Sequence, residues 1–254
     1  MQAAVFSDFS FWVFLGLAVL GVAAAGCGRA AWARAVGLAA LLAGLAFTGG
    51  VCAQTGRPPL GGALESLGYM ALVLATLAFG SQFGPGANRP LVALAWGAVV
   101  LLLFILVWVP RRVNPDWFIY HYTWNRAFFM CRLLAMPLLF YSALIALAWP
   151  GRDGDGEMRR LLITRSRRFL LLGTAVFLLG EVSGFYWCLS WRGDYWLWNR
   201  NFLESTMIFL LASAALHLPP KLAANPRALR LAYGPPGLLG MGAFLVHQVT
   251  ESFL

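Results

Sequence analysis

Charged residues are scarce in this sequence. Only 11% of its 254 residues are Asp, Glu, Lys or Arg, whereas 60% are hydrophobic, and the mean hydropathy is +0.72. A soluble domain of this length and composition would expose more apolar surface than water tolerates. The composition therefore excludes a soluble globular fold and indicates a multi-pass membrane protein.

Cysteine is also scarce and follows no ligand pattern. The four cysteines are Cys27, Cys52, Cys131 and Cys188. They form no CxxC pair and no zinc-like spacing, so we expect small buried side chains. Cys52 and Cys188 both fall toward the predicted outer face, which leaves a disulfide between them open. No internal repeat is found, and we predict a single membrane domain over residues 1–254, with an N-terminal helix pair over 1–58.

Long apolar runs define the predicted fold. A helix that crosses about 30 Å of hydrocarbon needs roughly 20 apolar residues. Such runs cover residues 9–26, 31–52, 64–82, 90–109, 122–149, 169–190, 200–218 and 236–254. The first run has no basic segment before it and is read as a retained helix rather than a signal peptide. The sequence thus predicts an all-α, polytopic membrane helix bundle of about eight transmembrane helices.

Basic residues are distributed unevenly among the predicted loops. One set of loops carries Arg29, Arg34, Arg89, Arg152, Arg159, Arg160, Arg165, Arg167, Arg168, Lys221, Arg227 and Arg230. The opposite set carries Arg57, Arg111, Arg112, Arg126, Arg192 and Arg200. Since Lys and Arg are retained on the cytoplasmic side, the first set is predicted inside and both termini outside. We expect a bacterial inner (cytoplasmic) membrane protein whose functional face is toward the periplasm.

The net charge of +9 reflects this topology rather than nucleic-acid binding, because the basic residues are dispersed. The one sizeable hydrophilic segment, residues 150–168, is predicted to be an inside loop at anionic lipid headgroups.

The three histidines lie at different predicted depths. His121 is in the outer loop before the fifth run, and His247 is in the outer half of the last run. His217 ends the seventh run at the inner face, about 27 Å below Asn199 by helical rise. Neutral imidazoles are axial ligands of b-type haem, so we predict these histidines as ligands of haem iron. The alternative for each is a hydrogen-bonded or snorkelling side chain.

Aromatic residues and arginines gather in "SWRGDYWLWNRN", residues 190–201. Aromatic faces suit a porphyrin, and guanidinium groups suit its carboxylates. The candidate haem contacts are Trp117, Arg126, Trp187, Trp191, Arg192, Tyr195, Trp196, Trp198, Asn199 and Arg200. The alternative is an ordinary aromatic belt at the membrane boundary.

This stretch resembles the tryptophan-rich loop of the cytochrome c assembly family, the CcsA/CcmC-type haem-handling membrane proteins with a WWD signature. The family pattern is roughly W-G-x-Y-W-x-W-D-P-K-E-T. The matching residues are Trp191, Gly193, Tyr195, Trp196 and Trp198, with one extra residue after the first.

The resemblance extends over residues 59–254, the predicted haem-handling core. His121 with Trp117 resembles the first outer histidine of the family, and His247 after "GLLGMGAFLV" resembles the second. His217 follows Trp198 at the spacing of the family's histidine at the far end of the next helix. "PLGGALESL", residues 59–67, resembles a P-L-x-x-x-x-E-S-L element of longer members.

The resemblance implies a protein that holds haem at the outer face for cytochrome c biogenesis, as part of a haem lyase (synthase) complex. Implied partners are haem, another membrane subunit and an outer c-type cytochrome or apocytochrome. Where the family has Asp-Pro-Lys-Glu, this chain has Asn199, Arg200, Asn201 and Phe202. That departure favours an alternative, a permanent b-haem subunit that transfers electrons between quinone and an outer cytochrome. A transporter ranks last, since no inverted repeats with broken helices are found.

Two charged residues fall within predicted helices. Arg132 and Glu181 each lie about 15 Å below the outer surface by helical rise. Charges at that depth cost several kcal/mol unless paired. They are therefore read as an ion pair or as a site of proton or quinone chemistry. Glu204 and Glu65 lie near helix starts, where an acidic group complements the macrodipole.

Glycines punctuate two of the predicted helices. Gly173, Gly180 and Gly184 lie in the sixth run, and Gly237, Gly240 and Gly242 lie in the eighth. Small residues allow close helix approach in lipid, which predicts packing contacts there. Pro235 and Pro236 are predicted to lie in the first turn of the last helix, where a missing N–H costs little.

Overall fold

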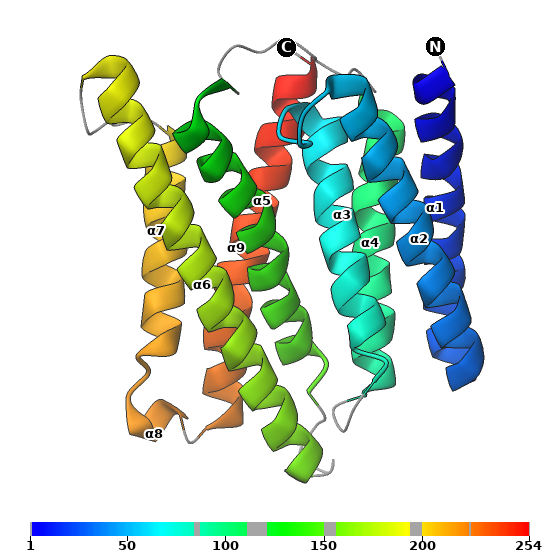
Figure 1. The fold of residues 1–254 in the computed structure, drawn as a ribbon. Coiled ribbons are helices and arrows are strands. Elements are labelled where there is room, and N and C mark those ends of the chain that lie inside the picture. Colours follow the sequence, from blue (N-terminus) through cyan, green and yellow to red (C-terminus); the bar gives the residue numbers. More distant parts are fainter. Residues whose placement is uncertain are drawn as a thin grey trace. The chain divides into compact units, whose positions relative to one another are not determined.

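The structure, a computed structural model, describes residues 2–83, 87–110, 121–149, 156–193, 200–223 and 225–253. These residues form helices and short connections and no strand, which confirms the all-α prediction (Figure 1). The helices are α1 (Gln2–Cys27), α2 (Ala30–Thr55), α3 (Gly62–Gly80), α4 (Arg89–Trp108), α5 (Thr123–Leu147), α6 (Gly156–Arg192), α7 (Arg200–Leu216), α8 (Pro220–Ala223) and α9 (Pro226–Phe253).

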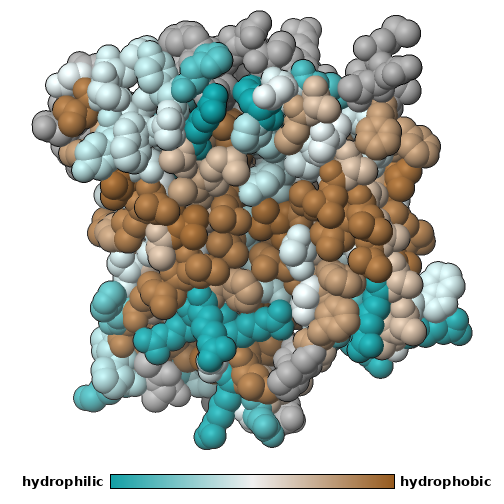
Figure 2. All heavy atoms as spheres, viewed as in Figure 1, coloured by the Kyte–Doolittle hydropathy of each residue, from teal (hydrophilic) through white to brown (hydrophobic). Residues whose placement is uncertain are grey.

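The predicted apolar runs correspond to α1 to α7 and α9. Among the described residues, 6 helices, α1 to α6, are long and apolar enough to cross a membrane. The apolar part of α7, Phe202–Leu216, is shorter. Hydrophobic side chains gather along the middle of the helices and hydrophilic ones toward their ends (Figure 2). The chain is a multi-pass helical membrane protein, and the orientation of its termini stays a prediction.

The chain divides into two compact units. Unit 1 comprises Met1–Asp116 together with His247–Leu254, and unit 2 comprises Trp117–Val246. In unit 1, α1 packs against α2 and α4, while α3 packs against the same two helices. Phe11, Phe14 and Trp96 are fully buried in this unit. In unit 2, α6 packs against α5 and α7.

The helix α6 begins much earlier than predicted. It starts at Gly156, so the part of the hydrophilic segment from 156 onward is helical rather than a loop. Its arginines do not prevent this, because Leu162, Ser166 and Leu170 recur at helical spacing and are buried. Ser166 also exchanges hydrogen bonds with Ser142 of α5: each hydroxyl donates to the other residue's carbonyl oxygen, at 2.9 and 2.8 Å.

The placement of Pro235 and Pro236 in a first turn was wrong. Both lie inside α9, which begins at Pro226. The true start follows Asn225, whose side-chain oxygen accepts a hydrogen bond from the Arg227 N–H at 3.0 Å. An asparagine cap with proline at the first helical position is a preferred helix start.

Close packing at the glycines is confirmed for most of them. An added Cβ would lie 2.8 Å from Leu139 at Gly173, 3.0 Å from Cys131 at Gly180 and 2.2 Å from the Leu139 carbonyl oxygen at Gly237. Gly240 has ordinary neighbours from 3.4 Å, and Gly242 has nothing within 4 Å. The glycines of α6 thus bring its backbone close to α5, and Gly237 does the same for α9.

The cysteines are less buried than predicted. Cys27 is exposed, the other three cysteines are half-buried, and none of the four forms a disulfide within the described chain. Cys131 packs against α6 at Gly180.

Candidate functional site on α5, α6 and α7

Three aromatic rings stack between α5 and α6. Trp187 and Trp191, one helical turn apart, are nearly parallel, with ring centroids 5.8 Å apart and planes at 9°. Phe128 of α5 stacks on Trp187 at 6.4 Å and 29°. Gly184 makes room for this, since a Cβ there would lie 2.6 Å from the Phe128 ring. We call Phe128, Trp187 and Trp191 the aromatic ladder.

A second aromatic pair lies at the same end of unit 2. Trp124 stacks on Tyr186 with centroids 5.0 Å apart and planes at 25°. Trp124 is 47% exposed, Tyr186 46% and Trp191 40%. Aromatic rings exposed at the ends of membrane helices suit the lipid headgroup region or a planar ligand.

His121 lies directly before α5, in a short helical turn, and is exposed. Trp124 follows one turn later, and Phe128 and Arg132 follow at intervals of four residues, so these three share one face of α5. Arg126, at the same end, is exposed. The sequence therefore places an imidazole, aromatic rings and a guanidinium group at the end of unit 2 where α5 begins.

The ladder ends on a cluster of charge. The Arg132 guanidinium lies 4.3 Å from the centroid of the Phe128 ring. It donates two hydrogen bonds to Oε1 of Glu181, at 3.0 and 2.7 Å, and a further one to the Ser205 hydroxyl of α7. The side chains of Arg132 and Glu181 are 18% and 28% exposed. The ion pair considered from the sequence is thus formed, and it joins three helices.

The other histidines have different surroundings. His217 is exposed in the turn after α7, and its Nδ1 lies 2.9 Å from the Ser213 carbonyl oxygen. A carbonyl accepts, so Nδ1 carries the proton and Nε2 keeps the lone pair that a metal needs. His247 is half-buried on α9 and belongs to unit 1, whereas His121 belongs to unit 2. Joint ligation of one iron by His121 and His247 stays a prediction.

Several predicted haem contacts lie outside the described residues, namely Trp117, Tyr195, Trp196, Trp198 and Asn199. The side chains of Arg192 and Arg200 are also outside them. Glu204 is half-buried on α7, one residue before Ser205. The roles proposed for all of these residues stay predictions.

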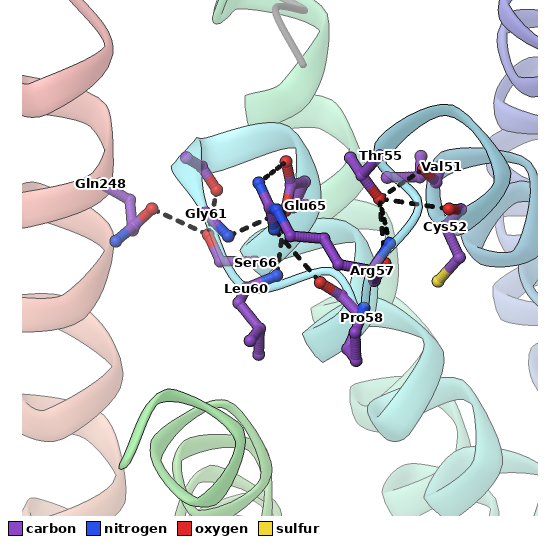
Figure 3. A network of polar contacts seen from close by, with 11 residues as sticks. Val51, Cys52, Thr55, Arg57, Pro58, Leu60, Gly61, Glu65, Ser66 and Gln248 are labelled. Carbon is purple, nitrogen blue, oxygen red and sulfur yellow. Dashed lines mark hydrogen bonds and ion pairs between the residues drawn. The ribbon is translucent and has the colours of Figure 1, made fainter. Parts of the chain in front are cut away.

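A polar network in unit 1 was missed by the sequence analysis (Figure 3). Glu65, whose side chain is 0% exposed, pairs with Arg57, which is 9% exposed. Its carboxylate also accepts hydrogen bonds from the backbone N–H groups of Leu60 and Gly61, at 3.0 and 2.9 Å. Glu65 therefore holds the α2–α3 loop in place and does not merely complement a helix dipole. The signal was an acidic and a basic residue flanking a Pro- and Gly-rich turn.

The residues at this end of unit 2 are compatible with haem. Haem needs only axial ligands from the protein, because the porphyrin supplies the others. The exposed imidazole of His121 could be such a ligand, and the exposed rings of Trp124, Tyr186 and Trp191 lie at the same end of the unit. Within the described chain, no group of three or more His, Cys, Asp or Glu side chains could hold a metal ion.

The fold and this cluster define the class: a multi-pass helical membrane protein with exposed aromatic and imidazole side chains at one end of unit 2 and a half-buried ion pair on the same helices. No family model and no curated protein matches the sequence. A solved structure described as "Cytochrome c Heme Lyase CcmF" has a similar fold, with a TM-score of 0.69 and 18% identity. The match covers 100% of this chain and 51% of that one, so the chain spans about half the length of the protein it matches.

Proposed function

We propose that the chain is a haem-handling membrane protein of cytochrome c biogenesis. The observation that carries this is the aromatic ladder together with the exposed imidazole of His121 at the same end of unit 2. Its support is the likeness in fold to a cytochrome c haem lyase. The haem is bound without covalent attachment, through histidine, as a b-type haem.

Each part of the cluster has a role in this proposal. His121 donates its imidazole lone pair to the iron, and Trp187 and Trp191 cover a porphyrin face with apolar surface. Arg126 meets a propionate, together with Arg192 and Arg200. His247 is the second outer ligand, and His217, through Nε2, holds or passes a second haem. The iron and porphyrin supply the redox chemistry, whereas these residues orient the group and exclude water.

The proposal includes partners and a location. The chain works with another membrane subunit and an outer c-type cytochrome or apocytochrome, and the cluster faces the periplasm of a bacterial inner membrane. Attachment of haem to apocytochrome c belongs to the resulting complex, in which this chain contributes the haem-holding part.

A spectrum of the purified chain tests the proposal. Wild-type protein incubated with haem should show a Soret band that shifts on reduction, as histidine-ligated b-haem does. The double variant Trp187→Leu/Trp191→Leu should bind haem about tenfold more weakly. This is the change expected when two aromatic contacts of ordinary strength are lost. The matched control is Trp32→Leu, because Trp32 is exposed on α2 with a relative exposure of 63%. Equal haem binding by both variants would remove the ladder from the proposal.

The alternative, a permanent b-haem subunit that transfers electrons between quinone and an outer cytochrome, is favoured by one observation. The ladder leads from Trp191 to Arg132 and Glu181, so the aromatic rings lie close to a half-buried acid paired with an arginine. Haem retention separates the two functions. A permanent subunit should keep one haem per chain through purification, whereas a handling protein should retain less than one and bind apocytochrome.

A further inference from the structure

We propose that Ser66 is a positioning residue for His247, acting through Gln248. This inference rests on the proposed role of His247 as a haem ligand. It gives a role to Glu65 and Ser66 at the start of α3, neither of which is among the proposed haem contacts.

A side-chain contact links the last turns of α9 to α3. The Ser66 hydroxyl oxygen and the side-chain amide of Gln248 lie within hydrogen-bond distance, at 2.8 Å (Figure 3). Ser66 is 1% exposed, and its contact with Gln248 is partly buried. A hydrogen bond between helices stabilises their contact and restricts their rotation.

Gln248 directly follows His247 on the helix. Successive side chains of an α-helix leave its axis about 100° apart. Holding Gln248 against α3 therefore sets the direction in which the His247 imidazole leaves α9. Without such a contact, the final turns of a helix fray.

The start of α3 is itself held in place, which makes Ser66 a firm anchor. Its hydroxyl lies 2.6 Å from the Gly62 carbonyl oxygen. A hydroxyl has one proton, so both contacts are made together when the Gln248 amide is turned to donate to Ser66. One residue earlier, Glu65 is bound to Arg57 and to the loop backbone. The α2–α3 loop, the start of α3 and the last turns of α9 are thus connected within unit 1.

The test measures how readily each histidine of the haem-free, full-length chain reacts with diethyl pyrocarbonate, by peptide mass spectrometry. Ser66→Ala should raise the reaction rate of His247 about fivefold. Losing one hydrogen bond of ordinary net strength changes the equilibrium between the docked and the frayed end of α9 by about this factor. His121 and His217 should react as in wild type. Ser66→Thr, which keeps the hydroxyl, should restore the wild-type rate.

Ser183→Ala is the matched control. Ser183 is buried and donates to the Leu179 carbonyl oxygen four residues earlier, at 2.8 Å, and it makes no hydrogen bond to another helix among the described residues. Gln248→Leu removes the same contact from the other side and decides the question if Ser66→Ala fails to fold. Combining Ser66→Ala with Gln248→Leu should add nothing to either single change.

An unchanged His247 rate in Ser66→Ala, or in Gln248→Leu, would overturn the positioning role. This readout needs no haem, so it is separate from the proposed function. Failure of the wild type to bind haem would refute the haem role and leave the anchoring of His247 intact. Haem binding by the wild type, together with an unchanged His247 rate in Ser66→Ala, would support the haem role and refute the positioning role.

Discussion

Replacing Glu65 with glutamine tests how the α2–α3 loop is held. Both carboxylate oxygens accept from the Arg57 guanidinium, at 2.7 and 3.1 Å. Whichever way a glutamine amide turned, its NH2 would face a guanidinium donor. The change therefore leaves the buried cation of Arg57 without its counter-charge and adds a repulsive contact.

The size of the effect follows from burial. Removing one partner of a buried ion pair costs about 3–5 kcal/mol. For a chain of this size, that corresponds to a drop in apparent Tm of about 10 °C. Removing both partners is much less costly, because no uncompensated charge remains.

The assay is thermal unfolding of the detergent-purified chain, monitored by fluorescence-detected size-exclusion chromatography. Glu65→Gln and Arg57→Met should each lower the apparent Tm, and the double variant should lower it by less than their sum. Glu157→Gln is the control, since Glu157 is exposed in the first turn of α6. A drop for Glu65→Gln no larger than that of the control, or additive losses in the double variant, would refute the reasoning.

Two further predictions concern helix contacts. Gly237→Ala should lower the apparent Tm of unfolding, because its Cβ would lie 2.2 Å from the α5 backbone, whereas Gly242→Ala has open space and should be neutral; equal shifts would contradict the packing. Glu181→Gln should reduce the yield of monodisperse protein, because Arg132 loses its counter-charge at a cost of about 3 kcal/mol. Adding Arg132→Met should recover part of that yield, and no recovery would show that the two residues are not coupled.

Most of the helices could be predicted from the sequence, since long apolar runs have few other stable states in a membrane. The α6 start could not be read from hydropathy, because arginines dominate residues 156–168. Their long side chains reach past the apolar face to water or headgroups. The spacing of Leu162, Ser166 and Leu170 was the available signal.

The predicted start of α9 was wrong because Pro235 and Pro236 suit a first helical turn, but so does Pro226 after the capping residue Asn225. Proline inside a membrane helix is tolerated where neighbouring groups satisfy the backbone. Here the segment after Pro235 and Pro236 packs on α5 through Gly237. A capping residue followed by proline was the better signal for a helix start.

The site was predictable in part. Depth along the helices suggested that Arg132 pairs with Glu181. The glycines indicated close packing of α6, and the structure shows that its partner is α5. The partner of Glu65 could not be found in this way. Arg57 lies in a turn with no periodicity, and its side-chain direction depends on the loop geometry that the pair itself creates.

The account depends most on haem being held by His121 and His247. The direct measurement is the absorption spectrum of the haem-loaded wild-type chain beside His121→Ala, His217→Ala and His247→Ala. The account predicts that the His121 and His247 changes abolish the same spectral species, while His217→Ala leaves that species intact. Independent effects at His121 and His247, or a wild-type chain without any haem spectrum, would contradict it.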